Sequence, residues 1–268
     1  MKSIRTPRER AREKTFARLF DEFRAGAYEE VEAAARALAA VPPSQWRRGR
    51  SLPRWQALTL ATGAAVAHGR GTEVLPELEA LIAELEPVDV ETELLRLIVR
   101  NHRTLVLIGE GRHREAEAEA LDVLRGTTRI ARLTSLGAVD LIALSHLATA
   151  LCGQGRHEEA EAVARGNLPR ARKSVLAALH AVLVRSLTGR GRYEEALAEA
   201  RRFTPPLSRG DSGRLDLVTA EALHGLGRRD EAEATVRRAL ADCRRDLHPA
   251  HPRIREARAL LGRITGDE

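Results

Sequence analysis

Residues 189–200 read GRGRYEEALAEA, and this stretch decides the fold because it recurs along the chain. The near-copies GEGRHREAEAEA, GQGRHEEAEAVA and GLGRRDEAEATV begin at residues 109, 153 and 225, and two weaker copies lie nearer the N-terminus. Self-similarity at intervals of 36 to 45 residues predicts stacked supersecondary units that bury their apolar faces against one another. The second glycine of each copy marks the repeats at Gly26, Gly71, Gly111, Gly155, Gly191 and Gly227.

Each copy has the pattern of a helix, a tight turn and a second helix. An apolar segment such as LIALSHLATALC (residues 141–152) precedes the glycine pair, and glycine ends a helix readily because it adopts the left-handed conformation. Acidic residues follow in the first turn of the next helix, where the helix dipole favours them. Close packing is expected where small residues face leucines: Ala116, Ala160, Ala196 and Ala232 against Leu107, Leu151, Leu187 and Leu223.

The turn carries a finer motif, which is a glycine, an often aromatic residue two positions on and an alanine five positions on. Gly191, Tyr193 and Ala196 match it fully. In the other clear copies His113, His157 and Arg229 take the aromatic position, and the two histidines are expected to pack at the turn. The pattern resembles the tetratricopeptide repeat family over roughly residues 92–245.

This resemblance implies an all-α fold, a right-handed α-solenoid of about six helix–turn–helix repeats with a C-terminal capping helix. We expect one domain over residues 1–268, with divergent repeats in 1–90, clear repeats in 91–245 and the capping helix at 250–265. Near the N-terminus Phe16, Leu19, Phe20 and Phe23 form one stripe at helical spacing, which predicts a core face.

Several classes of function lack their motifs. The sequence has no phosphate-binding loop, no dinucleotide glycine motif, no nucleophile elbow and no paired zinc histidines on a helix, which predicts a non-enzyme without cofactor or metal. Its two cysteines, Cys152 and Cys243, exclude a disulfide framework and are expected to be small buried residues. His248 and His251 are expected in a rigid loop before the capping helix, and the alternative is a metal or pH-sensitive site.

Charge and hydropathy bear on location and partners. The chain has a formal net charge of +6, and residues 1–60 and 151–210 form two basic zones with net charges of +6 and +5. Such zones can steer acidic partners or nucleic acid, although solvated surface is the commoner explanation. The first thirty residues lack the apolar segment of a secretory signal, and the fifteen-residue uncharged run at residues 141–155 is too short and polar to span a bilayer. We therefore expect a cytoplasmic protein without membrane contact.

Two surfaces are candidates for binding. The first is the stretch Val41–Trp55, expected to be a loop, which interleaves arginines with both tryptophans. The candidate binding residues of this stretch are Trp46, Arg47, Arg48 and Trp55. They could form a protein interface or stack on single-stranded bases. Alternatively, the two rings could simply pack over the joint between repeats.

The second candidate is the concave groove, which in the family is lined by the first helix of each pair. Carrying over this spacing selects Asn101, Leu105, Ser145, Thr149, Arg185, Thr188, Glu221 and His224. Arg185 interrupts an apolar run, so we expect it either to face the groove and bind a peptide carboxylate or to form an ion pair with a neighbouring repeat.

The resemblance favours a non-enzymatic scaffold or adaptor that binds a protein or peptide segment, acidic or with a free carboxylate, on its concave face. The alternative is a sensing regulator, similar to the peptide-binding repeats of bacterial quorum-sensing regulators, that acts with a separate DNA-binding partner. Direct nucleic-acid binding is less favoured, and we expect a monomer or weak homo-oligomer.

Overall fold

The computed structural model describes residues 7–41, 52–136, 138–203 and 209–266, and these ranges contain helices and no strand. The helices are α1 (Pro7–Ala25), α2 (Tyr28–Ala39), α3 (Leu52–His68), α4 (Gly71–Glu84), α5 (Val90–Gly109), α6 (His113–Ile130), α7 (Val139–Gly153), α8 (His157–Asn167), α9 (Lys173–Gly189), α10 (Tyr193–Arg202), α11 (Arg214–Gly225), α12 (Arg229–Asp246) and α13 (Pro252–Thr265). Two short 3-10 turns, η2 (Leu168–Arg170) and η3 (Arg209–Asp211), precede α9 and α11.

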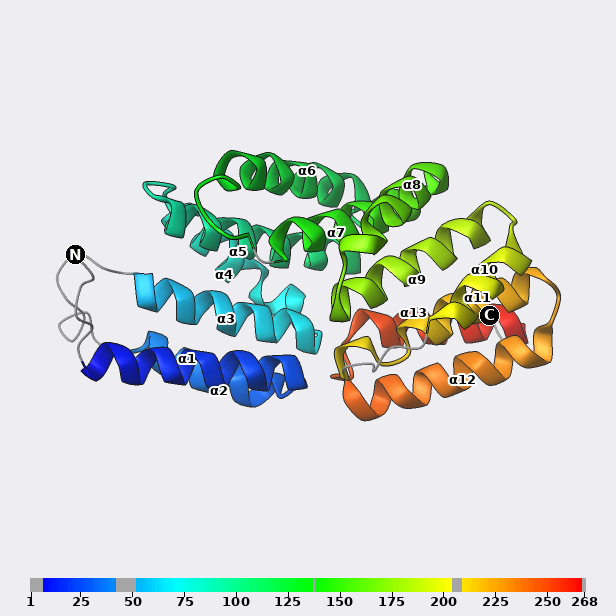
Figure 1. Ribbon diagram of the computed structural model, residues 1–268. Helices are drawn as coiled ribbons and strands as arrows, with labels where there is room; N and C mark the ends of the chain where they lie inside the picture. Colours follow the sequence, from blue (N-terminus) through cyan, green and yellow to red (C-terminus); the bar gives the residue numbers. More distant parts are fainter. Residues whose placement is uncertain (1–6, 42–51, 137, 204–208, 267–268) are drawn as a thin grey trace.

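Twelve of these helices form six successive pairs, and α13 follows the last pair as the expected capping helix (Figure 1). A glycine with positive φ ends the first helix of every pair: Gly26, Gly69, Gly111, Gly155, Gly191 and Gly227. The expected marker Gly71 is wrong by two positions, because Gly69 makes the turn and Gly71 begins α4. The all-α helical repeat predicted from the sequence is confirmed.

The residue two positions after each turn glycine begins the second helix and packs on the next repeat. A methyl group at Gly153, Gly189 or Gly225 would collide with the ring of His113, His157 or Tyr193 respectively. Each ring thus occupies space that a glycine near the end of the following first helix leaves empty. The predicted packing role of His113 and His157 is confirmed.

An arginine follows the turn glycine in repeats two to six, and in repeats two, four and five it pairs with a glutamate of the preceding repeat. Arg156 contacts Glu159 in its own helix with N–O distances of 2.7 and 2.6 Å, and reaches Glu117 of the preceding repeat at 2.6 Å. Arg192 pairs in the same way with Glu195 and with Glu161. The acidic first turn therefore binds an arginine as well as complementing the helix dipole.

The core follows the stack as a series of clusters of buried apolar residues, the largest of which extends over the C-terminal half. All four predicted small residues are fully buried and the four facing leucines are at most 6% exposed, as the sequence indicated. Cys152 and Cys243 are free and buried, as expected. In the N-terminal stripe Leu19 is fully buried, with Phe16 and Phe23 packed beside it. Phe20 departs from the predicted core, since its side chain is 48% exposed.

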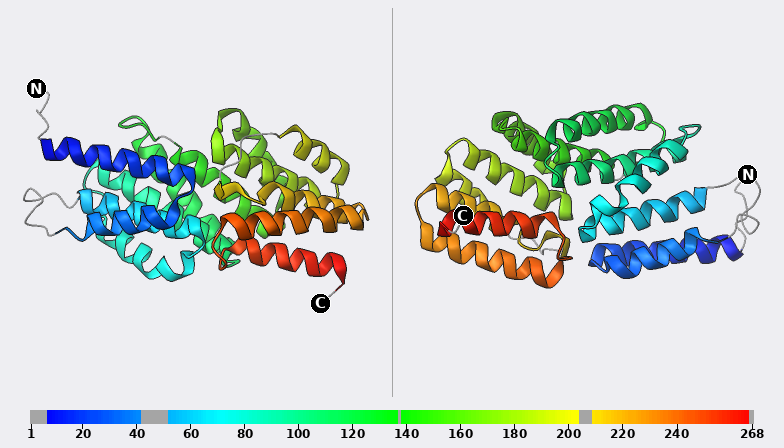
Figure 2. Two further views of the ribbon diagram at one scale, coloured as in Figure 1. Left: turned by 90° about the horizontal axis from the view of Figure 1, so that it is seen from below. Right: turned by 180° about the vertical axis from the view of Figure 1, so that it is seen from behind.

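The C-terminal segment returns to the turns of the second and third repeats. Figure 2 shows α12 and α13 reaching the ends of α2 and α3 in both views, and the His68 and His248 rings lie 5.0 Å apart between centroids. A Cβ on Gly69 would lie 2.6 Å from Cα of His251, and one on Gly109 would lie 2.9 Å from Cγ of Pro252. Because Gly71 brings no ring to the joint with the third repeat, Pro252 fills the space over Gly109. The stack is thereby closed by its own last loop.

The ring-over-glycine contact predicts opposite effects of two Gly→Ala changes. Gly189→Ala places a methyl group against the His157 ring, so we expect the free energy of unfolding to fall by about 1–3 kcal/mol. Gly166 lies in α8, and no atom is within 4 Å of the Cβ that Gly166→Ala would add. This change should raise the free energy of unfolding by about 0.5–1 kcal/mol. Urea unfolding measures both, and a stabilising Gly189→Ala would contradict the packing described.

Candidate functional site

The first helices of successive repeats place the side chain six positions before the turn glycine of repeats three to six on a shared inner face. These side chains are Leu105, Thr149, Arg185 and Glu221. Thr149 and Arg185 line one cavity, and Nε of Arg185 lies 3.3 Å from Oε2 of Glu221 across the repeat boundary. Leu105 is 41% exposed. These contacts bring Thr149, Arg185 and Glu221 together, and the continuity of the surface as far as Leu105 stays a prediction.

Other predicted groove residues lie elsewhere. Asn101 and Ser145 are 3% and 4% exposed, and both are hydrogen-bonded within the stack. Asn101 donates to the carbonyl of Val139 at 3.1 Å, and Ser145 donates to the carbonyl of Ile142 at 2.8 Å. Their predicted place on the groove surface is wrong because both side chains join or cap helices inside the stack.

Thr188 and His224 lie three positions before their turn glycines. Thr188 is half-buried and donates to the carbonyl of Val184 at 2.9 Å, while His224 is exposed. Neither lines the inner-face cavity, so the positions at minus six define the candidate surface better than those at minus three.

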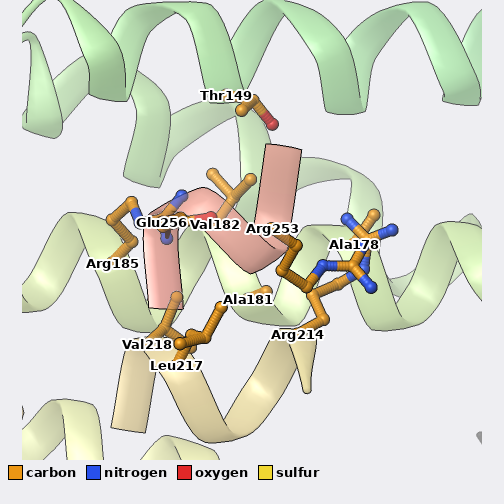
Figure 3. Close-up of a pocket in the computed structure, with 10 residues that line it drawn as sticks. All are labelled: Thr149, Ala178, Ala181, Val182, Arg185, Arg214, Leu217, Val218, Arg253 and Glu256. Atoms are coloured by element: carbon orange, nitrogen blue, oxygen red, sulfur yellow. Dashed lines mark hydrogen bonds and ion pairs between the residues drawn. The ribbon is translucent and has the colours of Figure 1, made fainter. Parts of the chain in front are cut away.

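A cavity of about 70 Å³ lies on the inner face between α7, α9, α11 and α13 (Figure 3). This volume is more than twice what one water molecule needs. Its polar lining comes from Thr149, Arg185, Arg214, Arg253 and Glu256, and its apolar lining comes from Ala178, Ala181, Val182, Leu217 and Val218.

Arg185 is held by carboxylates of its own chain. It pairs with Glu221 of the next repeat and with Glu256 of α13, and its side chain is 30% exposed. Burial opposes the charge of the guanidinium, but Glu256 and Glu221 outweigh burial and raise the pKa of Arg185. Of the two roles expected for Arg185, the structure therefore contains the ion pair with neighbouring elements.

Arg214 and Arg253 lie at the other end of the cavity, and their side chains extend toward the same region near Ala178 (Figure 3). Arg253 is only 8% exposed, and its Nη1 donates to the carbonyls of Gly210 and Ser212 at 3.1 and 2.8 Å. Burial, together with the nearby Arg214, lowers the pKa of Arg253 to about 9. The guanidinium stays charged at neutral pH in surroundings that oppose its charge.

Three histidines near this inner face are held neutral. Burial lowers the pKa of His102 to about 4, and burial with the nearby His102 and Arg214 lowers that of His146 to about 3. The pKa of His251 is lowered to about 2, chiefly by burial and by the charge of Arg253. His248 and His251 lie in the loop between α12 and α13 as expected, and the described residues contain no cluster suited to a metal ion.

The tryptophan–arginine candidate is only partly described. Trp46, Arg47 and Arg48 lie outside the described residues. Trp55 is on α3 and not in the expected loop, since the helix begins at Leu52. Its ring packs against the core between α3 and α4, and its Nε1 donates to Glu84 at 2.9 Å. Trp55 thus packs between the two helices of the second repeat and not in a loop over a joint between repeats.

Sequence reasoning missed Arg214 and Arg253. Both stand at the start of a helix, Arg214 as the first residue of α11 and Arg253 as the second of α13. A cation at a helix N-terminus opposes the helix dipole, and this was the available signal. What brings the two residues together is the return of α13 onto the stack, which no local pattern records.

Stacked helix pairs with a glycine turn and a ring seated on the next repeat define the class of helical-repeat proteins. Residues 141–180, which include most of α7 through the first half of α9, match the family model described as Tetratricopeptide repeat. Residues 141–180 are therefore similar to a tetratricopeptide repeat, which agrees with the all-α helical repeat of the fold. No curated protein matches it. None of the helices in the described ranges has the length and apolar character needed to cross a bilayer.

The depressed histidine pKa values predict a loss of stability in mild acid. His102, His146 and His251 are neutral when folded but titrate near 6.5 when unfolded, so below that pH protons bind preferentially to the unfolded chain. Each histidine then lowers the free energy of unfolding by up to about 1.4 kcal/mol per pH unit. Urea unfolding at pH 7.5 and 5.5 measures the effect, and His146→Gln should reduce the difference. Equal stability at the two pH values would contradict it.

The ion pairs of Arg185 predict coupling between α9 and α13. Arg185→Ala leaves Glu221 and Glu256 without their partner, and we expect a loss of about 1 kcal/mol because water partly screens these groups. Glu256→Gln in the same chain should restore part of this loss. A double-mutant cycle checks the coupling, and strictly additive effects would exclude a direct interaction.

Proposed function

We propose that this chain is a non-enzymatic, cytoplasmic scaffold that binds a protein or peptide segment along its inner face. Tetratricopeptide repeats commonly serve as protein-interaction scaffolds, and the match of residues 141–180 to this family supports the role. The observation that carries the proposal is the alignment of equivalent side chains in consecutive repeats, since Arg185 and Glu221 touch across a repeat boundary. A surface built by repetition suits an extended chain that passes several repeats.

The chemistry of this face favours an acidic segment. Three guanidinium groups, from Arg185, Arg214 and Arg253, line the cavity beside one carboxylate, Glu256. Arg185 alone is a weak anchor for a ligand carboxylate, because such a ligand competes with Glu221 and Glu256. We therefore propose apolar contact near Leu105 and electrostatic attraction toward the arginines as the two components of binding.

Two exposed leucines give a matched test. Leu105 lies at the inner-face position of α5 and Leu133 follows α6, with exposed fractions of 41% and 68%. Peptides selected from a display library for binding to the purified chain are measured by fluorescence anisotropy. We expect Leu105→Glu to weaken binding about tenfold or more, equivalent to about 1.4 kcal/mol, and Leu133→Glu to have little effect.

Circular dichroism confirms that both variants fold before affinities are compared. Unchanged binding by Leu105→Glu, with a loss in Leu133→Glu, would move the interaction to the outer surface. If the double variant Arg47→Ala, Arg48→Ala loses binding while both leucine variants retain it, the peptide binds at the segment before α3.

A further inference from the structure

Two arginines meet at one end of the inner-face cavity with little opposing negative charge. Arg214 Nε lies 3.4 Å from Oδ1 of Asp211, a carboxylate that also faces Arg253. Glu256 faces Arg253 as well, but it is paired with Arg185 at the opposite end. Arg214 and Arg253 therefore share the carboxylate of Asp211, whereas Arg185 alone pairs with two carboxylates.

Arg253 is fixed in this position at an energetic cost. Its side chain is more than nine-tenths buried, and the two carbonyls that accept from Nη1 carry no full charge. Burial of a charge is costly and a second guanidinium nearby adds repulsion, and Asp211 and Glu256 offset these two effects only in part. This repulsion would be relieved by removing one of the two arginines or by binding an anion between them.

The backbone adds positive potential at the same place. α11 begins at Arg214 and α13 at Pro252, and both helices exceed ten residues. Helix N-termini favour anions. The first turn of α11 carries Asp216 as well as Arg214, whereas the first turn of α13 has no acidic residue. An oxyanion between the two guanidinium groups would complement both helix ends and both side chains.

We propose that this end of the cavity, between the guanidinium groups of Arg214 and Arg253, binds a phosphate-type oxyanion. Each guanidinium presents a planar fork of donors that takes two acceptor oxygens. A tetrahedral phosphate has enough oxygens for both forks, whereas a planar carboxylate has two. The cavity volume of about 70 Å³ accommodates a group of this size. The site does not depend on peptide binding along the inner face, so the failure of one proposal leaves the other standing.

The site predicts an effect on a neighbouring histidine. Arg253, Arg214, His68 and Arg255 all lower the pKa of His251, with burial as the largest cause, and His248 lies in the same loop. A bound anion offsets the charges of Arg253 and Arg214, so it should raise the pKa of His251 toward its ordinary value. A salt effect on distant surface groups would not select this histidine.

The test is calorimetric titration of the full chain with inorganic phosphate at pH 7.5, in chloride buffer of constant ionic strength. We expect saturable binding at one site per chain, weakened about tenfold or more in Arg214→Gln. Arg238→Gln is the matched control, because Arg238 forms a similar ion pair with Asp216 but does not line the cavity. This variant should bind phosphate as tightly as the wild type. If Arg214→Gln does not fold, Arg214→Lys keeps the charge, loses the fork and should still bind more weakly.

Two further measurements complete the test. Histidine NMR should show phosphate raising the pKa of His251 in the wild type and leaving it unchanged in Arg214→Gln. Competition by a phosphoserine peptide would identify a phosphorylated partner side chain as the source, and binding of free phosphate alone would identify the inorganic ion. Absence of saturable binding, equal affinity in Arg214→Gln, or tighter binding of acetate than of phosphate would overturn the proposal.

Discussion

The packing of a ring against a glycine of the next repeat sets the spacing and angle of successive repeats. His113, His157 and Tyr193 each begin a second helix and fill space over a glycine near the end of the next first helix. The contact needs a flat side chain on one partner and no side chain on the other, so it fixes register as well as distance. At the second repeat Gly71 offers no ring, and Pro252 from the C-terminal loop fills the space over Gly109. A local departure from the repeat is thereby coupled to the closure of the whole stack.

Closure also determines the electrostatics of the inner face. Most arginines along the turns are neutralised by repetition, since Arg156 and Arg192 each bridge a glutamate in their own helix and one in the preceding repeat. Arg253 enters from α13, outside the repeat pattern, and has no glutamate placed for it by that pattern. Arg253 therefore lines the cavity in surroundings where Asp211 and Glu256 offset only part of the cost of burial and of the nearby Arg214.

Sequence periodicity predicted what depends on neighbours within one repeat. The buried alanines, the facing leucines and the inner-face position six residues before the turn glycine all follow from helix geometry over a few turns. The second turn was misplaced because HGRG offers two glycines, and the alignment of Arg70 with the other turn arginines would have selected Gly69. Asn101 could not be assigned correctly, since its partner is a carbonyl 38 residues away. Arg185 meets Glu256 across 71 residues, and that pairing exists only because α13 folds back.

Anion binding and protonation at the closed end are linked by thermodynamics. An oxyanion between Arg214 and Arg253 would favour a proton on His251, and by reciprocity that proton would favour the anion. Without the anion, the same proton lies beside two guanidinium groups and opposes the contact between the last loop and the turn at Gly69. Acid alone therefore loosens the closure, whereas acid together with a bound oxyanion is compatible with it. The fold thus places a titrating group, a charged pair and a structural contact within one small region, so that none of them responds independently of the others.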